Sequence, residues 1–221
     1  ALRPSTTIIF DLTGKACCRL TGCYTNSFWM NTATPDTHNA SGKSITGLTY
    51  PLDEFCRIAK RPLPAIQFVD AQDVPEPYHS LLVHKQDMTS TLGQFHGDEI
   101  GLRVLSLEIR GNAYYREVML LTKRSQRPVE YGAIKIDISA FPAQAQAAIT
   151  TAVVPLGQLL KDYKIDYKSM PSGFLSIQCD DYIGELFNYP EKPLLFGRRN
   201  TLYNINSDAK MAEIVEILPI S

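Results

Sequence analysis

The feature that most constrains the fold of this chain is a series of strand patterns joined by tight turns. Residues 102–109 alternate side chains as a strand does, and Gly111-Asn112 then predicts a hairpin turn into residues 114–122. Residues 129–138 alternate in the same way, with isoleucines on one face and charged side chains on the other. Because strands joined by short turns pair antiparallel, these segments predict an antiparallel sheet.

The remaining patterns add helices and two further strands to this sheet. Residues 78–94 place apolar side chains at helical intervals, and two short helices are expected over 141–153 and 158–163, with Pro155 between them. Strands are expected near 199–206 and 211–218. Strands outnumber helices and do not alternate with them, so the sequence predicts an α+β single domain, a mostly antiparallel β-sheet with flanking helices.

Composition excludes several classes of protein. Lys and Arg total 22 and Asp and Glu total 23, giving a net charge of −1, whereas proteins that coat nucleic acid carry a strong positive field. No apolar run approaches the roughly 20 residues that span a bilayer. Five scattered cysteines form no CxxC pair, which favours free thiols in a reducing cytoplasm over disulfides or a metal site. We therefore expect no nucleic-acid partner and no membrane span.

The first 50 residues differ from the rest. Residues 30–43 are almost entirely Asn, Thr, Ser, Pro, Asp, His, Gly and Ala, which bury too little surface to order themselves. Met30 is a possible translation start, so whether residues 1–29 belong to the native protein stays open. Residues 1–50 are predicted to be a disordered or non-native extension, and residues 51–221 the folded domain.

Arg116 is the first residue that needs a chemical explanation. At period two its neighbours on the strand are Tyr114, Val118 and Leu120, so its guanidinium lies on an apolar face. Such a charge is costly unless an anion meets it. One interpretation is a salt bridge to a core carboxylate, and the other is a bidentate clamp for a substrate carboxylate.

Glu216 presents the same problem with the opposite charge. Its neighbours at period two are apolar, and desolvation of an isolated carboxylate there would raise its pKa. Glu213 points to the opposite face, and the pattern alone does not choose between them. In another interpretation, one of these glutamates forms an ion pair with Arg116 or Arg198 in the core and has only a structural role.

Two weaker signals accompany these residues. Arg198 and Arg199 follow Gly197 at a strand entrance, where a basic pair is usually solvated but is also able to hold an anionic group. The turn at Gly157 offers backbone N–H groups to an anion or a polar group. His79 and His84 have no metal-ligand spacing and are expected at the surface.

Six short motifs run in order from about residue 76 to residue 219. They are Asp87-Met88-Thr89, Tyr115-Arg116-Glu117-Val118, Gly132, Pro155-Leu156-Gly157, Gly197-Arg198-Arg199 and Glu216-Ile217-Leu218-Pro219. In this order and spacing, which covers about two thirds of the chain, the sequence resembles the chorismate pyruvate-lyase (4-hydroxybenzoate synthase) family, in its divergent branch.

The resemblance implies a chorismate lyase-like fold and a lyase that removes pyruvate from chorismate to leave 4-hydroxybenzoate, with no metal or organic cofactor. By position, Arg116 would bind the ring carboxylate together with the backbone N–H of Met88. Glu216 and the backbone N–H of Leu156, beside Gly157, would meet the ring oxygen where the enolpyruvyl ether leaves. Arg198 or Arg199 would assist the second carboxylate. A monomer is expected, and the pathway that uses the product stays open.

The sequence departs from the family pattern in two places. Ala133 follows Gly132 where some members carry Arg, and the last hairpin is longer, which keeps Glu213 as a rival of Glu216. Two other functions stay open: a non-catalytic domain of the same fold that binds a small aromatic acid, as in the effector domains of some transcription regulators, and a lyase that gives a different hydroxybenzoate. Residues 1–75 carry no helix-turn-helix pattern, which argues against the regulator.

Overall fold

The computed structural model describes residues 6–10, 16–19 and 47–219. Its strands are β1 (Thr6–Phe10), β2 (Ala16–Arg19), β3 (Ile66–Val69), β4 (Ile100–Arg110), β5 (Ala113–Thr122), β6 (Pro128–Asp137), β7 (Tyr167–Gln178), β8 (Leu194–Asn204) and β9 (Lys210–Leu218). Its helices are α1 (Leu52–Ala59), α2 (Tyr78–Leu82), α3 (Met88–His96), α4 (Ala143–Thr151), α5 (Leu156–Asp162) and α6 (Asp181–Phe187), with short 3₁₀ turns at Ala71–Asp73 and Ile138–Ala140.

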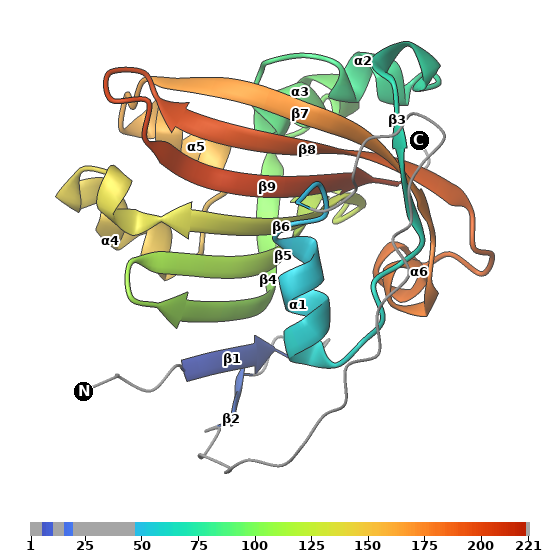
Figure 1. Cartoon of the computed structure of the whole chain (residues 1–221), viewed down its shortest axis with the longest axis horizontal. Coiled ribbons are helices and arrows are strands. Elements are labelled where there is room, and N and C mark those ends of the chain that lie inside the picture. Colours follow the sequence, from blue (N-terminus) through green and yellow to red (C-terminus); the bar gives the residue numbers. More distant parts are fainter. Residues whose placement is uncertain (1–5, 11–15, 20–46, 220–221) are drawn as a thin grey trace.

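The nine strands of the described residues form one sheet in the order β2-β1-β4-β5-β6-β9-β8-β7-β3, and every neighbouring pair is antiparallel. Figure 1 shows this sheet with helices on both sides. The predicted fold class, an α+β single domain built on an antiparallel sheet, is confirmed.

The predicted hairpin lies between β4 and β5. Arg110 pairs with Ala113, so the loop contains Gly111 and Asn112 alone. Gly111 has a φ of +59°, a left-handed conformation that glycine adopts without steric cost. The turn therefore sets the register of β4 against β5, in which Arg116 lies opposite Leu107.

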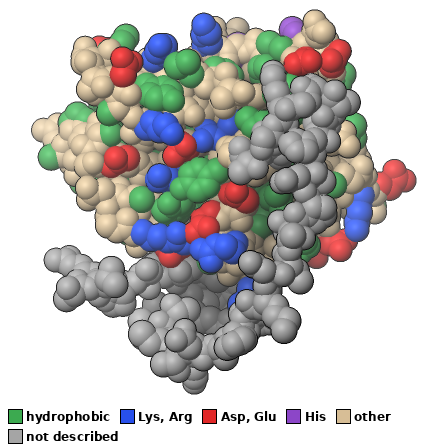
Figure 2. All heavy atoms as spheres, in the orientation of Figure 1, with side chains coloured by type: hydrophobic (Ala, Val, Ile, Leu, Met, Phe, Trp, Pro, Cys, Tyr) green, Lys and Arg blue, Asp and Glu red, His purple; other side chains and the backbone are tan. Residues whose placement is uncertain are grey.

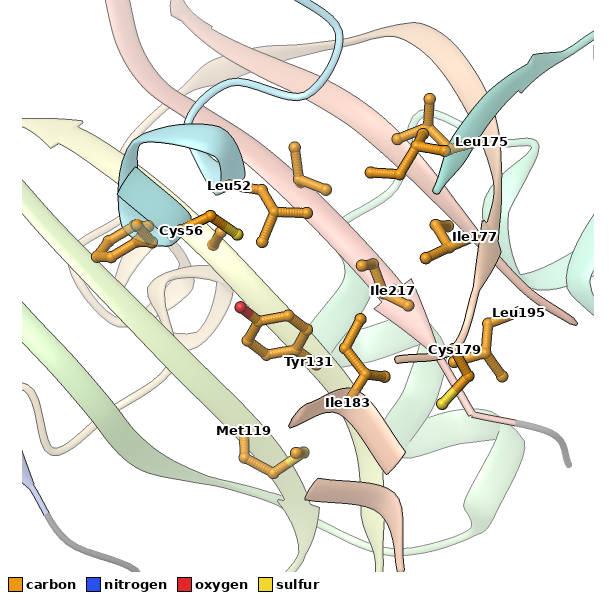
Figure 3. Close-up of a cluster of buried hydrophobic side chains, with 14 of the residues drawn as sticks. Leu52, Cys56, Met119, Tyr131, Leu175, Ile177, Cys179, Ile183, Leu195 and Ile217 are labelled. Atoms are coloured by element: carbon orange, nitrogen blue, oxygen red, sulfur yellow. The ribbon is translucent and has the colours of Figure 1, made fainter. Parts of the chain in front are cut away.

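Side-chain alternation along the strands gives the sheet two buried faces. On one face α1 and α6 cover a cluster that includes Leu52, Tyr131, Ile183 and Ile217 (Figure 3). The opposite face packs against α2, α3, α4 and α5 through side chains such as Ile136. Even-numbered residues from Tyr114 to Leu120 in β5 and from Glu130 to Ile136 in β6 belong to this second face, which carries the candidate site.

Several elements differ from the sequence prediction. The helical pattern of residues 78–94 forms two helices, because the backbone leaves helical geometry at Val83 and the side chain of Asp87 caps a new helix. Strands β3 and β7 and helices α1 and α6 were not predicted. Strands β1 and β2 lie inside residues 1–50, and β1 pairs with β4. The predicted disorder of the remaining N-terminal residues, and Met30 with them, lies outside the described part of the chain.

One face of the molecule is mixed in charge. On the face drawn in Figure 2, basic and acidic side chains are interspersed with apolar ones. In the described part of the chain, no helix is long and apolar enough to cross a bilayer.

Candidate functional site

A cavity lies between one face of the sheet and the first turns of α3 and α5. The space between its lining atoms is about 580 Å³, which includes the open solvent at its mouth. The residues that line it include five of those predicted from the sequence: Met88, Arg116, Leu156, Gly157 and Glu216. The remaining lining residues are mostly apolar, among them Leu102, Val118, Leu120, Ile134, Leu160, Leu202 and Ile214.

Arg116 extends from β5 into this cavity. The residue is 2% exposed, and neither Nε nor Nη1 has a hydrogen-bond partner among the described residues. Burial lowers the pKa of the guanidinium. In the described chain no carboxylate pairs with Arg116, so the interpretation as a core salt bridge is wrong. An unpaired buried guanidinium is costly, and an anionic ligand would remove that cost.

Glu216 lies on β9, between Gly132 of β6 and Arg198 of β8. Its Oε2 accepts a hydrogen bond from Nε of Arg198, and both side chains are buried. Glu216 is therefore not the isolated carboxylate that the periodicity predicts. The alternative in which it pairs with Arg198 is confirmed.

Arg198 also forms hydrogen bonds with the backbone of the segment between α2 and α3. Its Nη1 donates to the carbonyl oxygens of Leu82 and His84, each at 3.1 Å, and its Nη2 donates to that of Gln86 at 3.3 Å. The arginine is fully buried inside β8 and does not line the cavity. The expectation of a solvated strand entrance is therefore wrong for this residue. Its contacts connect Glu216 to the backbone that leads into Met88.

Arg199 and Glu213 lie on the opposite face of the sheet. Nη2 of Arg199 donates to Oε1 of Glu213 at 2.9 Å, and Lys135 and Lys210 each approach that carboxylate to 3.4 Å. These cations lower the pKa of Glu213. Glu216, and not Glu213, therefore faces the cavity, and Arg199 is a buried structural partner of Glu213 and not a surface residue.

Glu130 is a site residue that the sequence analysis missed. It lines the cavity from β6, it is 4% exposed, and its Oε2 has no hydrogen-bond partner among the described residues. Burial, together with the charge of Glu216, raises the pKa of this carboxyl group well above its usual value. The sequence does contain a signal for this residue: Glu130 is spaced by even intervals from Ile134 and Ile136, so a charged side chain lies on the apolar face of the strand.

Met88, Leu156 and Gly157 come together where α3 and α5 begin. Asp87 caps α3 by accepting a hydrogen bond from the backbone N–H of Ser90 at 2.8 Å. A Cβ at Gly157 would lie 2.8 Å from Oδ1 of Asp87 and 3.0 Å from Oγ1 of Thr89. Glycine at this position therefore permits the close approach of the two helices over the cavity.

The described residues offer no metal site. No group of three or more His, Cys, Asp or Glu side chains converges in the part of the chain that the structure describes. Cys56 and Cys179 are buried free thiols, as expected, and burial raises the pKa of Cys56 to about 11. The side chains of Cys17, Cys18 and Cys23 lie outside the described residues.

Comparison with known proteins gives distant structural matches. No family model and no curated protein matches this sequence. Among solved structures, the effector domain of PhnF from Mycobacterium smegmatis is similar with a TM-score of 0.46 at 11% identity, over 62% of this chain and 90% of that chain. The C-terminal domain of the histidine utilization repressor from Pseudomonas syringae pv. tomato matches with a TM-score of 0.39 at 10% identity, over 55% of this chain and 92% of that chain. A GntR-family transcriptional regulator from Enterococcus faecalis V583 matches with a TM-score of 0.37 at 11% identity, over 53% and 91%.

Proposed function

We propose that the cavity binds the carboxylate of a small ring acid on Arg116, and that the protein is a lyase that removes pyruvate from chorismate to leave 4-hydroxybenzoate. The observation that carries the binding step is the buried Arg116 guanidinium, whose Nε and Nη1 find no partner among the described residues. The choice of chorismate rests on the motifs that resemble the chorismate pyruvate-lyase family.

The side chains that line the cavity support a flat ring acid as ligand. Aliphatic side chains such as Val118, Ile134 and Ile214 line it, and they suit the faces of a ring. The planar guanidinium of Arg116 matches a carboxylate in bidentate geometry. Such a pair is strong where water is excluded, because the surrounding dielectric constant is low.

The proposed reaction needs orientation and the management of one proton. The ether C–O bond between the ring and the enolpyruvyl group breaks, and the adjacent ring carbon loses its proton, so that the ring becomes aromatic. The departing enolpyruvate takes up a proton and becomes pyruvate. No electron acceptor is required. Glu216 is the group proposed to orient the ring oxygen and to handle the proton, while Arg116 fixes the opposite end of the ring.

A second candidate function is a non-catalytic domain that binds a small aromatic acid. One observation favours it: Glu216 is already paired with Arg198, so that its charge is compensated within the protein. In this case Glu216 would accept a hydrogen bond from a ligand hydroxyl group and perform no proton transfer.

Incubation of the purified protein with chorismate tests the proposal. We expect equal amounts of pyruvate and 4-hydroxybenzoate, detected by a coupled pyruvate assay and by chromatography, and no product with Arg116→Ala. Binding of 4-hydroxybenzoate without formation of pyruvate would favour the non-catalytic domain. Formation of 3-hydroxybenzoate would indicate a lyase of altered outcome. A protein that neither binds nor converts either acid would contradict both functions.

A further inference from the structure

A second carboxyl group, that of Glu130, lines the cavity, and its Oε2 has no hydrogen-bond partner among the described residues. Glu130 extends from β6, opposite Leu120 of β5, and two features show that its side chain is directed into the cavity. It belongs to the cavity lining, and its Oε1 lies 3.0 Å from the position that a Cβ at Gly132 would take. A buried polar group in this situation carries a free-energy cost until a donor or an acceptor meets it.

The charged groups around Glu130 indicate whether its carboxyl group is protonated or ionised. The negative charge of Glu216 on β9 acts on Glu130. Arg198 on β8, whose positive charge also acts on Glu130, is engaged by Glu216 and by three backbone carbonyl groups. Asp87 at the start of α3, Tyr167 on β7 and Arg116 on β5 are the other ionisable groups of the cavity lining. A second ionised carboxylate would therefore repel Glu216 without a cation of its own.

A neutral carboxyl group differs from a carboxylate in what it recognises. A carboxylate only accepts hydrogen bonds, whereas a protonated carboxyl group donates one. The cavity thus offers two kinds of oxygen contact beside the guanidinium: Glu216 as an acceptor and Glu130 as a donor. A ligand hydroxyl or ether oxygen is able to use such a donor, and an unsubstituted ring is not.

We propose that Glu130 is a second ligand-contacting group of this site, which in its protonated form donates a hydrogen bond to an oxygen substituent on the ring of the bound acid. This inference rests on the proposed function, because it requires that Arg116 holds the carboxylate of a ring acid in the cavity. The hydrogen bond from Glu130 makes the site prefer ring acids that carry an oxygen substituent over ring acids that carry none.

Calorimetric titration of the full chain with 4-hydroxybenzoate and with benzoate tests this assignment. The wild type should prefer 4-hydroxybenzoate, and Glu130→Leu should lose about tenfold or more of that preference while binding benzoate as before. Glu130→Gln keeps a hydrogen-bond donor and should retain the preference. Glu117→Gln, which changes a buried glutamate on the other face of the same sheet, is the matched control and should bind both acids as the wild type does.

The pH dependence provides a second readout that does not require Glu130→Leu to fold. As the pH rises and Glu130 ionises, the wild type should lose affinity for 4-hydroxybenzoate, whereas the affinity of Glu130→Gln should stay constant over the same range. Equal pH profiles for the two proteins, or an unchanged preference in Glu130→Leu, would overturn the role of Glu130 and leave the proposed function intact. Failure of the wild type to bind either acid would overturn both.

Discussion

Three buried ionisable side chains share one cavity, and each is held in a different way. Arg116 has two nitrogen atoms without a partner among the described residues, Glu130 has an unpartnered oxygen, and Glu216 is paired with Arg198. Periodicity in the sequence was sufficient to find Arg116 and Glu216, because a charge in an apolar pattern stands out. The same pattern contains Glu130, which was overlooked. The partner of Glu216 follows from the register of β8 and β9, which no local pattern specifies.

The two glutamates of β9 give the first prediction at this scale. Glu216→Gln should lower kcat with chorismate by about 100-fold or more, since it removes the group proposed to handle the proton, and should leave binding of 4-hydroxybenzoate nearly unchanged. Glu213→Gln, on the opposite face of the sheet, is the matched control and should keep the wild-type kcat. Steady-state kinetics measures kcat for both variants. A low kcat in Glu213→Gln together with a wild-type kcat in Glu216→Gln would contradict the assignment of the reacting group to the cavity face of the sheet.

Glu130 gives a prediction about stability. Its pKa is raised in the folded protein, so the folded state retains a proton that the unfolded chain releases above about pH 4.5. The contribution of Glu130 to stability is therefore complete at low pH and is lost as the pH rises toward the folded-state pKa, by up to about 1.4 kcal/mol per pH unit. Urea unfolding across this range should show that wild type loses stability relative to Glu130→Gln. A difference that is independent of pH would contradict the buried neutral carboxyl group.

At the scale of elements, the sequence predicts those segments whose pattern is local. The β4–β5 hairpin, β6, α4, α5 and β9 follow from side-chain alternation, helical spacing and a Gly-Asn turn. Strand β7 contains Pro171 and Gly173, with a register shift between them, so its alternation is interrupted and its strand character comes from pairing with β8. Arg198 and Arg199 appear as a loop pair in the sequence because their partners lie far along the chain: glutamates on β9 for both and, for Arg198, also the backbone between α2 and α3.

The close contact of α5 with α3 leads to a prediction for Gly157→Ala. The added Cβ would lie 2.8 Å from Oδ1 of Asp87, whose position the cap of α3 fixes, so the two helices must move apart. We expect a loss of about 1–3 kcal/mol in the free energy of unfolding and weaker binding of 4-hydroxybenzoate. Gly184→Ala in α6 is the control, because its nearest neighbours are 3.7 Å away. Urea unfolding and titration measure both effects, and wild-type values for Gly157→Ala would contradict the packing described for this contact.

At the scale of the whole molecule, the sheet separates two environments. One face carries the cavity with Arg116, Glu130 and Glu216, and the other carries ion pairs such as Arg199 with Glu213. That the protein is a monomer stays a prediction of the sequence, as do the disorder of the N-terminal residues and the absence of a nucleic-acid partner.

Removal of residues 1–43 tests the domain boundary. The truncated protein loses β1 and β2, which pair at the β4 edge of the sheet, and keeps every residue that lines the cavity. We expect it to fold, as judged by circular dichroism, and to bind 4-hydroxybenzoate with the affinity of the full chain. Loss of folding would refute a self-sufficient domain over residues 51–221.

The most direct measurement of the central claim compares two ligands that differ only in the group proposed to meet Arg116. 4-Hydroxybenzyl alcohol has the ring and hydroxyl group of 4-hydroxybenzoate but no carboxylate. Calorimetry should show that the wild type prefers the acid by about 2–4 kcal/mol, that Arg116→Ala loses this preference, and that Arg116→Lys regains only part of it. A preference for the acid that survives in Arg116→Ala would show that the carboxylate is bound elsewhere.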